Sequence, residues 1–298
     1  MNEPTKAVPQ GSFLERNEFL LRRLHSLSGL VPVGAYMVIH LLTNASVLNS
    51  PASFQRNVYS IHSLGAMLPL VEWVFIFLPL IYHAVYGVLI VRGAAPNSST
   101  YKYTSNVRYT LQRATGMIAF VFIFWHVFHM HGWIHSEWWE KGVAQPLYGA
   151  MFRPYNAAST AAQAMQISLI VPILYAIGVL SCVFHLANGI WTFGITWGIW
   201  VTPAAQRWAT TACLVFGLLL AAVSMGALGG FAFGVDPKEA REVENLMYEK
   251  QFAVEIEEAK EHGTTDPNAK KRYDPKEQVR GHSPATAAVE DKKDKGEQ

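Results

Sequence analysis

Five long apolar segments constrain the fold of this chain more than any other feature. They run roughly over residues 24–48, 64–91, 114–134, 167–190 and 208–233. A helix needs about 20 mostly apolar residues to cross the hydrocarbon core of a bilayer, and each segment reaches that length. Core helices of water-soluble proteins are usually shorter and carry a polar face. The sequence therefore predicts an all-α membrane protein with five transmembrane helices in a bundle.

Charge is distributed unevenly along the 298 residues. From Asp236 onward acidic residues outnumber basic ones by 16 to 12, whereas before it basic residues outnumber acidic ones by 12 to 6. Residues 237–262 are charged and compatible with a helix, and residues 263–298 have the composition of a disordered segment. We therefore predict three parts: an N-terminal segment (1–23), a five-span membrane domain (24–233) and a charged, partly disordered tail (234–298).

The basic residues near the spans predict the orientation. With the N-terminus inside, nine basic residues fall on inner segments and three on outer loops, as the positive-inside rule requires. The first apolar segment is too long for the core of a signal peptide, so we expect it to be retained. The expected location is the cytoplasmic (inner) membrane, with a cytoplasmic N-terminus and the C-terminal tail outside.

Four consecutive spans each contain a histidine in apolar surroundings: His40, His83, His126 and His185. An ionisable group inside a bilayer is costly and indicates a function. Neutral imidazole is the usual axial ligand of b-type haem, and helix bundles build such sites from facing side chains. We therefore expect these four histidines to bind haem iron.

Depth in the membrane predicts which histidines pair. At a rise of 1.5 Å per residue, His40 lies about 25 Å and His126 about 20 Å from the inner end of its span, whereas His83 lies about 14 Å from that end. His185 comes late in a span that runs inward. The expected pairs are His40 with His126 (the outer pair) and His83 with His185 (the inner pair). His129 is a substitute ligand if the register differs.

Cationic and polar residues at the inner end of the first span could contact a haem. His25 lies there beside Arg22 and Arg23, and these groups could hold anionic haem propionates. Positive-inside anchoring explains the arginines equally well.

The two cysteines, Cys182 and Cys213, lie inside predicted spans and outside any C-x-x-C pattern. That placement argues against a disulfide framework, an iron–sulfur site or covalently attached c-type haem.

Several stretches carry a resemblance to a known family. "RRLHSLSGLVPVG", "FLPLIYHAVYGV", "LQRATG" followed by "WHVF", and "FHLANGIWTFGITWGIWVTP" resemble the membrane anchor of succinate dehydrogenase. They are most similar to the five-helix, dihaem cytochrome b subunit of bacteria that use menaquinone. The resemblance covers all five spans, from about residue 13 to residue 233. The outer loop after the third span and the charged tail are both longer than is usual in that family.

The resemblance implies residue roles that agree with the pairing above. The family's four haem-binding histidines fall on His40, His83, His126 and His185, and a polar pair at an inner haem propionate falls on His25 and Ser26. Some relatives carry an acidic residue near the outer end of the second helix for quinone protonation. Its nearest counterparts here are His62 and Glu72.

The implied function is electron transfer. Partner flavoprotein and iron–sulfur subunits would oxidise succinate, and this chain, itself not catalytic for succinate, would anchor them in the lipid bilayer. It would carry electrons through two b haems to menaquinone, or in reverse as part of a fumarate reductase. We expect no nucleic acid among its partners.

Two alternatives stay open. One is the dihaem anchor of another quinone-linked oxidoreductase, such as a nitrate reductase or formate dehydrogenase, although those proteins usually place paired ligands on shared helices. The other is a haem-free transporter with a histidine proton relay, which the absence of a pair of broken spans disfavours.

Overall fold

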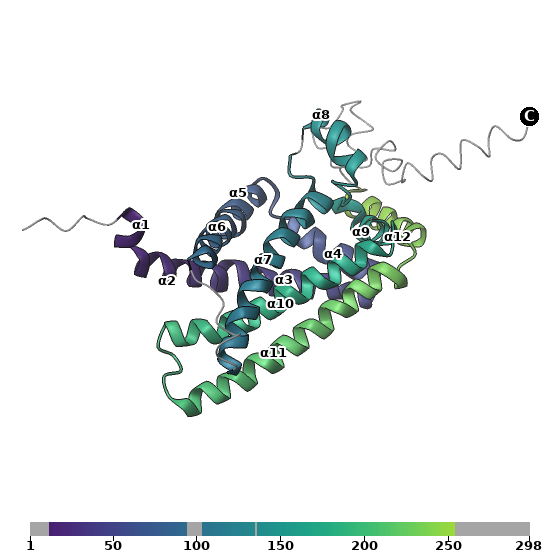
Figure 1. Ribbon diagram of the computed structural model, residues 1–298. Helices are drawn as coiled ribbons and strands as arrows, with labels where there is room; N and C mark the ends of the chain where they lie inside the picture. Colours follow the sequence, from purple (N-terminus) through teal and green to yellow (C-terminus); the bar gives the residue numbers. More distant parts are fainter. Residues whose placement is uncertain (1–11, 94–102, 135, 254–298) are drawn as a thin grey trace, which may run out of the picture. The chain divides into compact units, whose positions relative to one another are not determined.

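The computed structural model describes residues 12–93, 103–134 and 136–253, and within them all regular structure is helical (Figure 1). Five helical segments there are long and apolar enough to cross a membrane: Glu18–Leu48, Gly65–Arg92, Thr104–His131, Ile170–Thr196 and Pro203–Gly234. The prediction of an all-helical membrane protein with five spans is confirmed. The third helix begins ten residues before its apolar part, because helical structure continues through the polar turns that hydropathy does not mark.

The first two spans each contain a wider helical turn and stay helical through it. The first consists of α2 (Glu18–Ser28), a π-helical turn (Gly29–Gly34) and α3 (Ala35–Ala45), and α1 (Phe13–Arg16) precedes it. Pro32 lies in that turn and has no N–H to donate to the helical ladder. The second span joins α5 (Leu68–Glu72) to α6 (Leu78–Arg92) through another π-helical turn. Turns of this kind occur frequently at functional sites.

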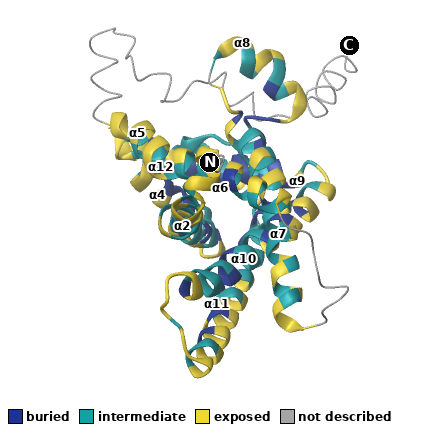
Figure 2. Ribbon diagram, turned by 60° about the vertical axis from the view of Figure 1, so that its left-hand side comes forward, coloured by how far each residue is buried: buried dark blue, intermediate teal, exposed yellow. Residues whose placement is uncertain are grey.

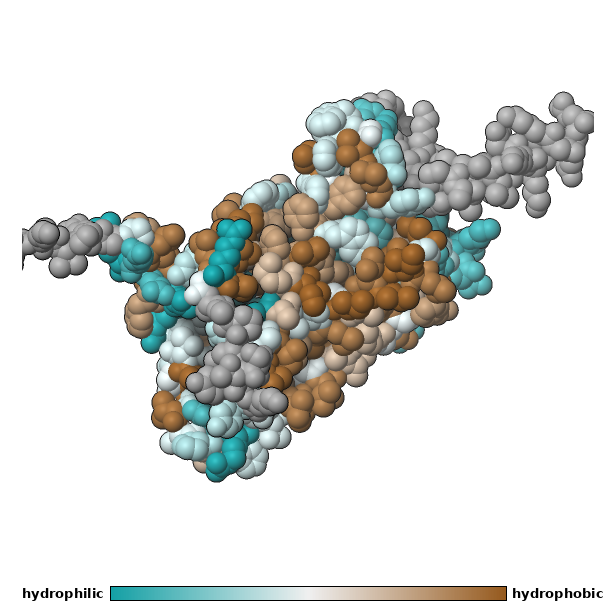
Figure 3. Space-filling view, in the orientation of Figure 1, coloured by the Kyte–Doolittle hydropathy of each residue, from teal (hydrophilic) through white to brown (hydrophobic). Residues whose placement is uncertain are grey.

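The remaining spans are continuous α-helices over most of their length. They are α7 (Thr104–His131), α10 (Ile170–Thr196) and α11 (Pro203–Gly229). Large apolar side chains on the spans are exposed, including Phe75, Phe124 and Leu218. Exposed residues occur along the helices in Figure 2, and hydrophobic residues cover much of the face drawn in Figure 3. Such apolar surface suits contact with lipid rather than water.

Contacts within the chain define two compact units. Unit 1 comprises the described residues of Met1–Met37, Leu70–Met117 and Phe184–Gly217. In it, α2 packs against α6, and the Tyr82 hydroxyl donates a hydrogen bond of 2.9 Å to the backbone oxygen of Leu21. Unit 2 comprises the described residues of Val38–Pro69, Ile118–Val183 and Leu218–Gln298.

The core of unit 2 includes three helices that lie outside the predicted spans. They are α4 (Pro51–His62), α9 (Ala157–Gln166) and α12 (Pro237–Gln251), which contact one another pairwise. Alanines occupy half of α9, and all five are buried. Small side chains let neighbouring helices approach closely. A short helix, α8 (Glu137–Trp139), precedes this region in the loop after the third span.

Side chains that are remote in sequence cap the N-terminus of α9. The Oε1 atom of Gln55 accepts the backbone N–H of Ala157 at 2.8 Å. Glu244 accepts the N–H groups of Ala158 and Ser159 at 2.5 and 3.2 Å, and the Ser159 hydroxyl at 2.6 Å. The first N–H groups of a helix have no partner within the helix, so these side-chain acceptors supply partners at the start of α9. These bonds therefore join α4, α9 and α12.

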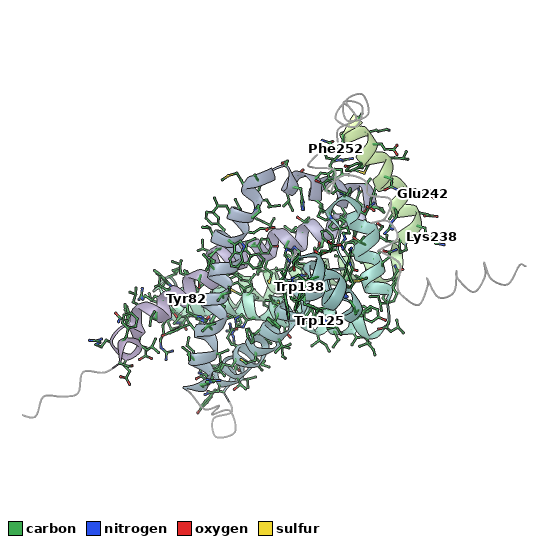
Figure 4. All side chains as sticks on the ribbon, turned by 90° about the horizontal axis from the view of Figure 1, so that it is seen from above. Tyr82, Trp125, Trp138, Lys238, Glu242 and Phe252 are labelled. Atoms are coloured by element: carbon green, nitrogen blue, oxygen red, sulfur yellow. The ribbon has the colours of Figure 1, made fainter. Side chains whose placement is uncertain are left out.

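The charged tail begins with a well-defined helix. Asp236 caps α12 by accepting the N–H groups of Lys238 and Glu239 at 2.7 and 3.3 Å, and Pro237 occupies its first turn, as is common at helix starts. Lys238 and Glu242 point outward from α12 (Figure 4). The predicted disordered segment 263–298 lies outside the described residues.

Candidate functional site

The inner pair lies in unit 1. The imidazole centroids of His83 on α6 and His185 on α10 are 6.0 Å apart, with the ring planes at 84°. A metal–imidazole bond is about 2 Å long. Two such bonds in line, plus the distance from each bonded nitrogen to its ring centre, give a separation close to the one observed. The separation of the two rings therefore suits a metal ion bound between them.

Backbone carbonyl groups orient both rings of the inner pair. His83 Nδ1 lies 2.9 Å from the backbone oxygen of His25, and His185 Nδ1 lies 3.0 Å from that of Gln112. A carbonyl oxygen only accepts hydrogen bonds, so each Nδ1 carries the proton. Each Nε2 is then left with the lone pair that a metal requires.

A glycine four residues after each carbonyl makes these contacts possible. A Cβ atom on Gly29 would lie 2.2 Å from His83 Cε1, and one on Gly116 would lie 2.8 Å from His185 Cε1. The two imidazoles thus reach the helix backbone over residues without side chains. The stretches "HSLSG" and "QRATG" place the carbonyl and the glycine at the same spacing, which gives a physical reason for two of the stretches that carry the family resemblance.

A polar network surrounds the backbone of His185. Gln112 donates from Nε2 to the His185 backbone oxygen at 3.1 Å and accepts from Asn188 Nδ2 at 2.8 Å. Asn188 in turn accepts from Arg108 Nε at 2.9 Å, and the Arg108 guanidinium lies 3.9 Å from the centre of the Trp191 ring. These hydrogen bonds join α7 to α10 beside His185.

The four candidate propionate contacts differ in availability. The His25 ring stacks on His83, with centroids 4.1 Å apart, and its Nδ1 is buried without a hydrogen-bond partner among the described residues. Arg23 Nε is in the same state, while its guanidinium lies over Phe19 and Trp197. Buried polar atoms normally have partners, so these two nitrogens fit an anionic group of a bound cofactor.

The other two candidates already have partners. Arg22 is exposed and pairs with Glu18, Nε to Oε1, at 2.7 Å. The Ser26 hydroxyl accepts a hydrogen bond of 3.3 Å from Trp197 Nε1. His25 and Arg23 are therefore the better candidates for a propionate contact.

The outer pair lies in unit 2 and has the same spacing. The centroids of His40 on α3 and His126 on α7 are 6.0 Å apart, with the ring planes at 70°. His40 Nε2 lies 3.3 Å from Asn44 Nδ2, so coordination through this nitrogen would displace the amide. Nδ1 of His129, the substitute ligand, lies 2.8 Å from the Tyr175 hydroxyl. The spacing therefore favours His126 over His129 as the partner of His40.

Tyr175 on α10 links His126 to His129. Its hydroxyl lies 3.2 Å from His126 Nδ1 and 2.8 Å from His129 Nδ1. Trp125, labelled in Figure 4, stacks on His129 with centroids 5.0 Å apart, and Phe122 stacks on His126 with centroids 5.7 Å apart. No pattern in the sequence identifies Tyr175, because a tyrosine inside an apolar span has no spacing that marks it as a partner of a buried histidine.

The two candidate quinone residues belong to different units. His62 ends α4 in unit 2, and its Nδ1 lies 3.0 Å from the Val58 backbone oxygen. Glu72 ends α5 in unit 1 and lies within the second span. Both are partly buried.

The ligand set suits haem better than a bare metal ion. In the described part of the chain, no group of three or more His, Cys, Asp or Glu side chains could hold a metal. A porphyrin supplies four nitrogens to its iron, so the protein would need to supply only the remaining ligands. Each histidine pair could supply two of them. The glycines beside the inner rings would leave room for those rings, and the unpartnered buried nitrogens could bind propionates.

The chain is similar in sequence to a known bacterial protein. It is 38% identical over 216 residues to the succinate dehydrogenase cytochrome b558 subunit of Bacillus subtilis (strain 168). The matched region covers 72% of this chain and 97% of that protein. No family model matches the chain. Its five helices that could cross a membrane agree with the architecture expected from the resemblance. At this identity and coverage, the chain belongs to the family of succinate dehydrogenase cytochrome b subunits.

Proposed function

We propose that this chain is the membrane anchor and dihaem cytochrome b subunit of a succinate dehydrogenase or fumarate reductase. It passes electrons from an iron–sulfur subunit through two b haems to menaquinone. The observation that carries the proposal is the presence of two histidine pairs, His83 with His185 and His40 with His126, each with ring centroids 6.0 Å apart. A bound haem b supplies one-electron redox chemistry, which no side chain of these pairs provides.

The chain itself holds and orients the ligands. In the inner pair, the carbonyl groups of His25 and Gln112 fix the proton on Nδ1 of each imidazole, and Gly29 and Gly116 give the rings room. His25 and Arg23 hold propionates through their unpartnered nitrogens. In the outer pair, His126 stacks on Phe122 and lies beside the Tyr175 ring.

The partners follow from the family. A flavoprotein subunit and an iron–sulfur subunit carry out succinate chemistry on the cytoplasmic side, and this chain is itself not catalytic for succinate. The protein lies in the cytoplasmic membrane with its N-terminus inside and its C-terminal tail outside, as the basic residues indicate. Menaquinone is reduced near the outer pair, with His62 as the group that handles protons and Glu72 as the second candidate.

Haem content of the purified complex tests the proposal. Pyridine haemochrome analysis is expected to give two haems b per chain, both reduced by succinate in a reduced-minus-oxidised spectrum. Co-purifying flavoprotein and iron–sulfur subunits identify the partners. A complex without a b-type α-band would exclude the dihaem role, and reduction by another donor in place of succinate would support a different quinone-linked oxidoreductase.

A further inference from the structure

The two histidine pairs are oriented by different kinds of group. Both rings of the inner pair donate Nδ1–H to backbone carbonyl oxygens. In the outer pair, Nδ1 of His126 meets a side chain, the Tyr175 hydroxyl, at 3.2 Å. A hydroxyl both donates and accepts, so the Tyr175 hydroxyl can accept a hydrogen bond from His126 and donate one to a further partner. A backbone carbonyl oxygen only accepts.

That further partner is His129. The Tyr175 hydroxyl lies 2.8 Å from His129 Nδ1, and both residues are buried, with 6% and 2% of their surface exposed. Nε2 of His129 has no hydrogen-bond partner among the described residues. The face of His129 is covered by the Trp125 ring at an interplanar angle of 9°. The imidazole is therefore held in place to meet the phenol with its Nδ1.

The direction of the two hydrogen bonds follows from the role of His126. An imidazole that binds iron through Nε2 carries its proton on Nδ1, so His126 donates to the Tyr175 oxygen. The phenol must then donate to His129 Nδ1, which puts the proton of neutral His129 on Nε2. Reversing both bonds would place the proton of His126 on Nε2 and remove the lone pair that a metal needs.

We propose that Tyr175 and His129 are positioning residues for His126, with Tyr175 accepting the Nδ1–H of the ligand and His129 accepting the phenol proton. The inference rests on the proposed function, because it assigns His126 to an outer haem. A hydrogen bond to the outer nitrogen of a ligating histidine fixes its ring and raises its basicity. Consecutive hydrogen bonds polarise one another, so His129 strengthens the contact that Tyr175 makes. A more basic imidazole favours the ferric state of a bound haem.

Redox titration of the purified, full-length complex tests the proposal. Tyr175→Phe is expected to keep both haems by pyridine haemochrome and to shift the midpoint potential of the outer haem to a more positive value. The inner potential should stay unchanged, because its ligands bond to backbone groups. Tyr82→Phe is the matched control: it removes a hydroxyl that bonds to a backbone oxygen rather than to a ligand nitrogen, and it should leave the outer potential unchanged.

Two substitutions of His129 provide the second readout. The side-chain oxygen of an asparagine can occupy the place of His129 Nδ1, so His129→Asn should keep the outer potential close to that of the unmodified complex. His129→Leu removes the acceptor and should shift the potential in the same direction as Tyr175→Phe. If Tyr175→Phe releases the outer haem, the difference in outer midpoint potential between His129→Asn and His129→Leu still tests the proposal.

The failures are distinguishable. An unshifted outer potential in Tyr175→Phe, with two haems bound, would overturn the positioning role alone. Equal potentials in His129→Asn and His129→Leu would overturn the role of His129 as acceptor. Absence of haem from the unmodified complex would overturn the proposed function, and this inference with it.

Discussion

His83 donates its Nδ1–H to the backbone oxygen of His25 at 2.9 Å, and the two imidazole rings are stacked with their planes 5° apart. His25 thus holds His83 from two directions, through its main chain and through its ring. The contact lies directly over Gly29. It ties the first span to the second at the point where an iron would be bound.

Alanine substitutions should separate the two haems. His83→Ala or His185→Ala is expected to remove the inner haem, and His40→Ala or His126→Ala the outer one, because iron that loses an axial ligand in an apolar site loses its anchor. Each variant should contain half the haem of the unmodified complex by pyridine haemochrome. Full haem content in any variant would disprove that ligand, and for His126 the first substitute to examine is His129.

Glycine substitutions should affect the inner haem in a graded manner. In Gly29→Ala the new methyl group would lie 2.2 Å from His83 Cε1 and 2.4 Å from Nδ1, whereas in Gly116→Ala the nearest His185 atom would be 2.8 Å away. We expect Gly29→Ala to lose the inner haem and Gly116→Ala to keep part of it. Gly229→Ala, at a helical position with nothing within 4 Å, is the control. Full inner haem content in Gly29→Ala would show that the backbone moves to make room.

The cap on α9 should make unit 2 sensitive to pH. Burial raises the pKa of Glu244 from its ordinary value of 4.5 to about 7, although the donors on Ser159 and Ala158 and the charge of Arg241 oppose the shift. A carboxyl with a raised folded-state pKa binds more protons when folded, so the stability it contributes is complete below about 4.5 and is lost as the pH rises through about 7. Hydrogen exchange of the α9 and α12 amides should therefore become faster between pH 5 and 7.

Glutamine provides the control for this pH dependence. Glu244→Gln keeps an acceptor and removes the titration, so its exchange, corrected for the intrinsic pH effect, should vary less over this range. Glu242→Gln, on the exposed face of the same helix (Figure 4), should behave like the unmodified protein. Identical pH profiles for Glu244→Gln and the unmodified protein would refute the assignment.

Quinone reduction near the outer pair should depend on the membrane potential. Quinone reduction takes up protons, and moving one charge across 100 mV is worth about 2.3 kcal/mol. An uncoupler should therefore abolish succinate oxidation by intact cells and spare reduction of an artificial acceptor. His62→Ala should lower quinone reduction and retain both haems. Full quinone activity in His62→Ala would exclude this residue, and insensitivity to uncouplers would exclude an outer site.

Protease added to right-side-out vesicles should shorten the chain. The C-terminal tail is expected outside, because five spans follow a cytoplasmic N-terminus. Removal of residues 254–298 should leave both haems bound, since the four proposed ligand histidines and their described partners all precede this segment. Protection in right-side-out vesicles, with cleavage in inverted ones, would reverse the proposed topology.

The spans and the histidine pairs were predictable, because they depend on simple periodic or additive properties. Apolar length marks a span regardless of its neighbours. Depth along a helix grows by a fixed rise per residue, so residues at similar depth can be matched without knowing how the helices pack. The structure places His40 near His126 and His83 near His185, in the pairing that depth predicts.

The groups around the proposed ligands could not be predicted in this way. Tyr175 and Gln112 matter through the direction of a hydrogen bond, which depends on how two helices are rotated. The capping of α9 by Gln55 and Glu244 joins residues about 100 and 86 positions apart in sequence, and no local pattern announces it. Tertiary contacts, rather than propensity, determine where such partners lie.

The cap on α9 also sets an order of assembly during synthesis. A chain emerges from the ribosome N-terminus first, so α4 and α9 are complete before α12 exists. Until Glu244 arrives, the N–H groups of Ala158 and Ser159 lack the acceptors that they have in the finished protein. The contacts between α9 and α12 can therefore form only after the fifth span has been made. A chain released before α12 is synthesised would lack the hydrogen bonds that Glu244 accepts from α9.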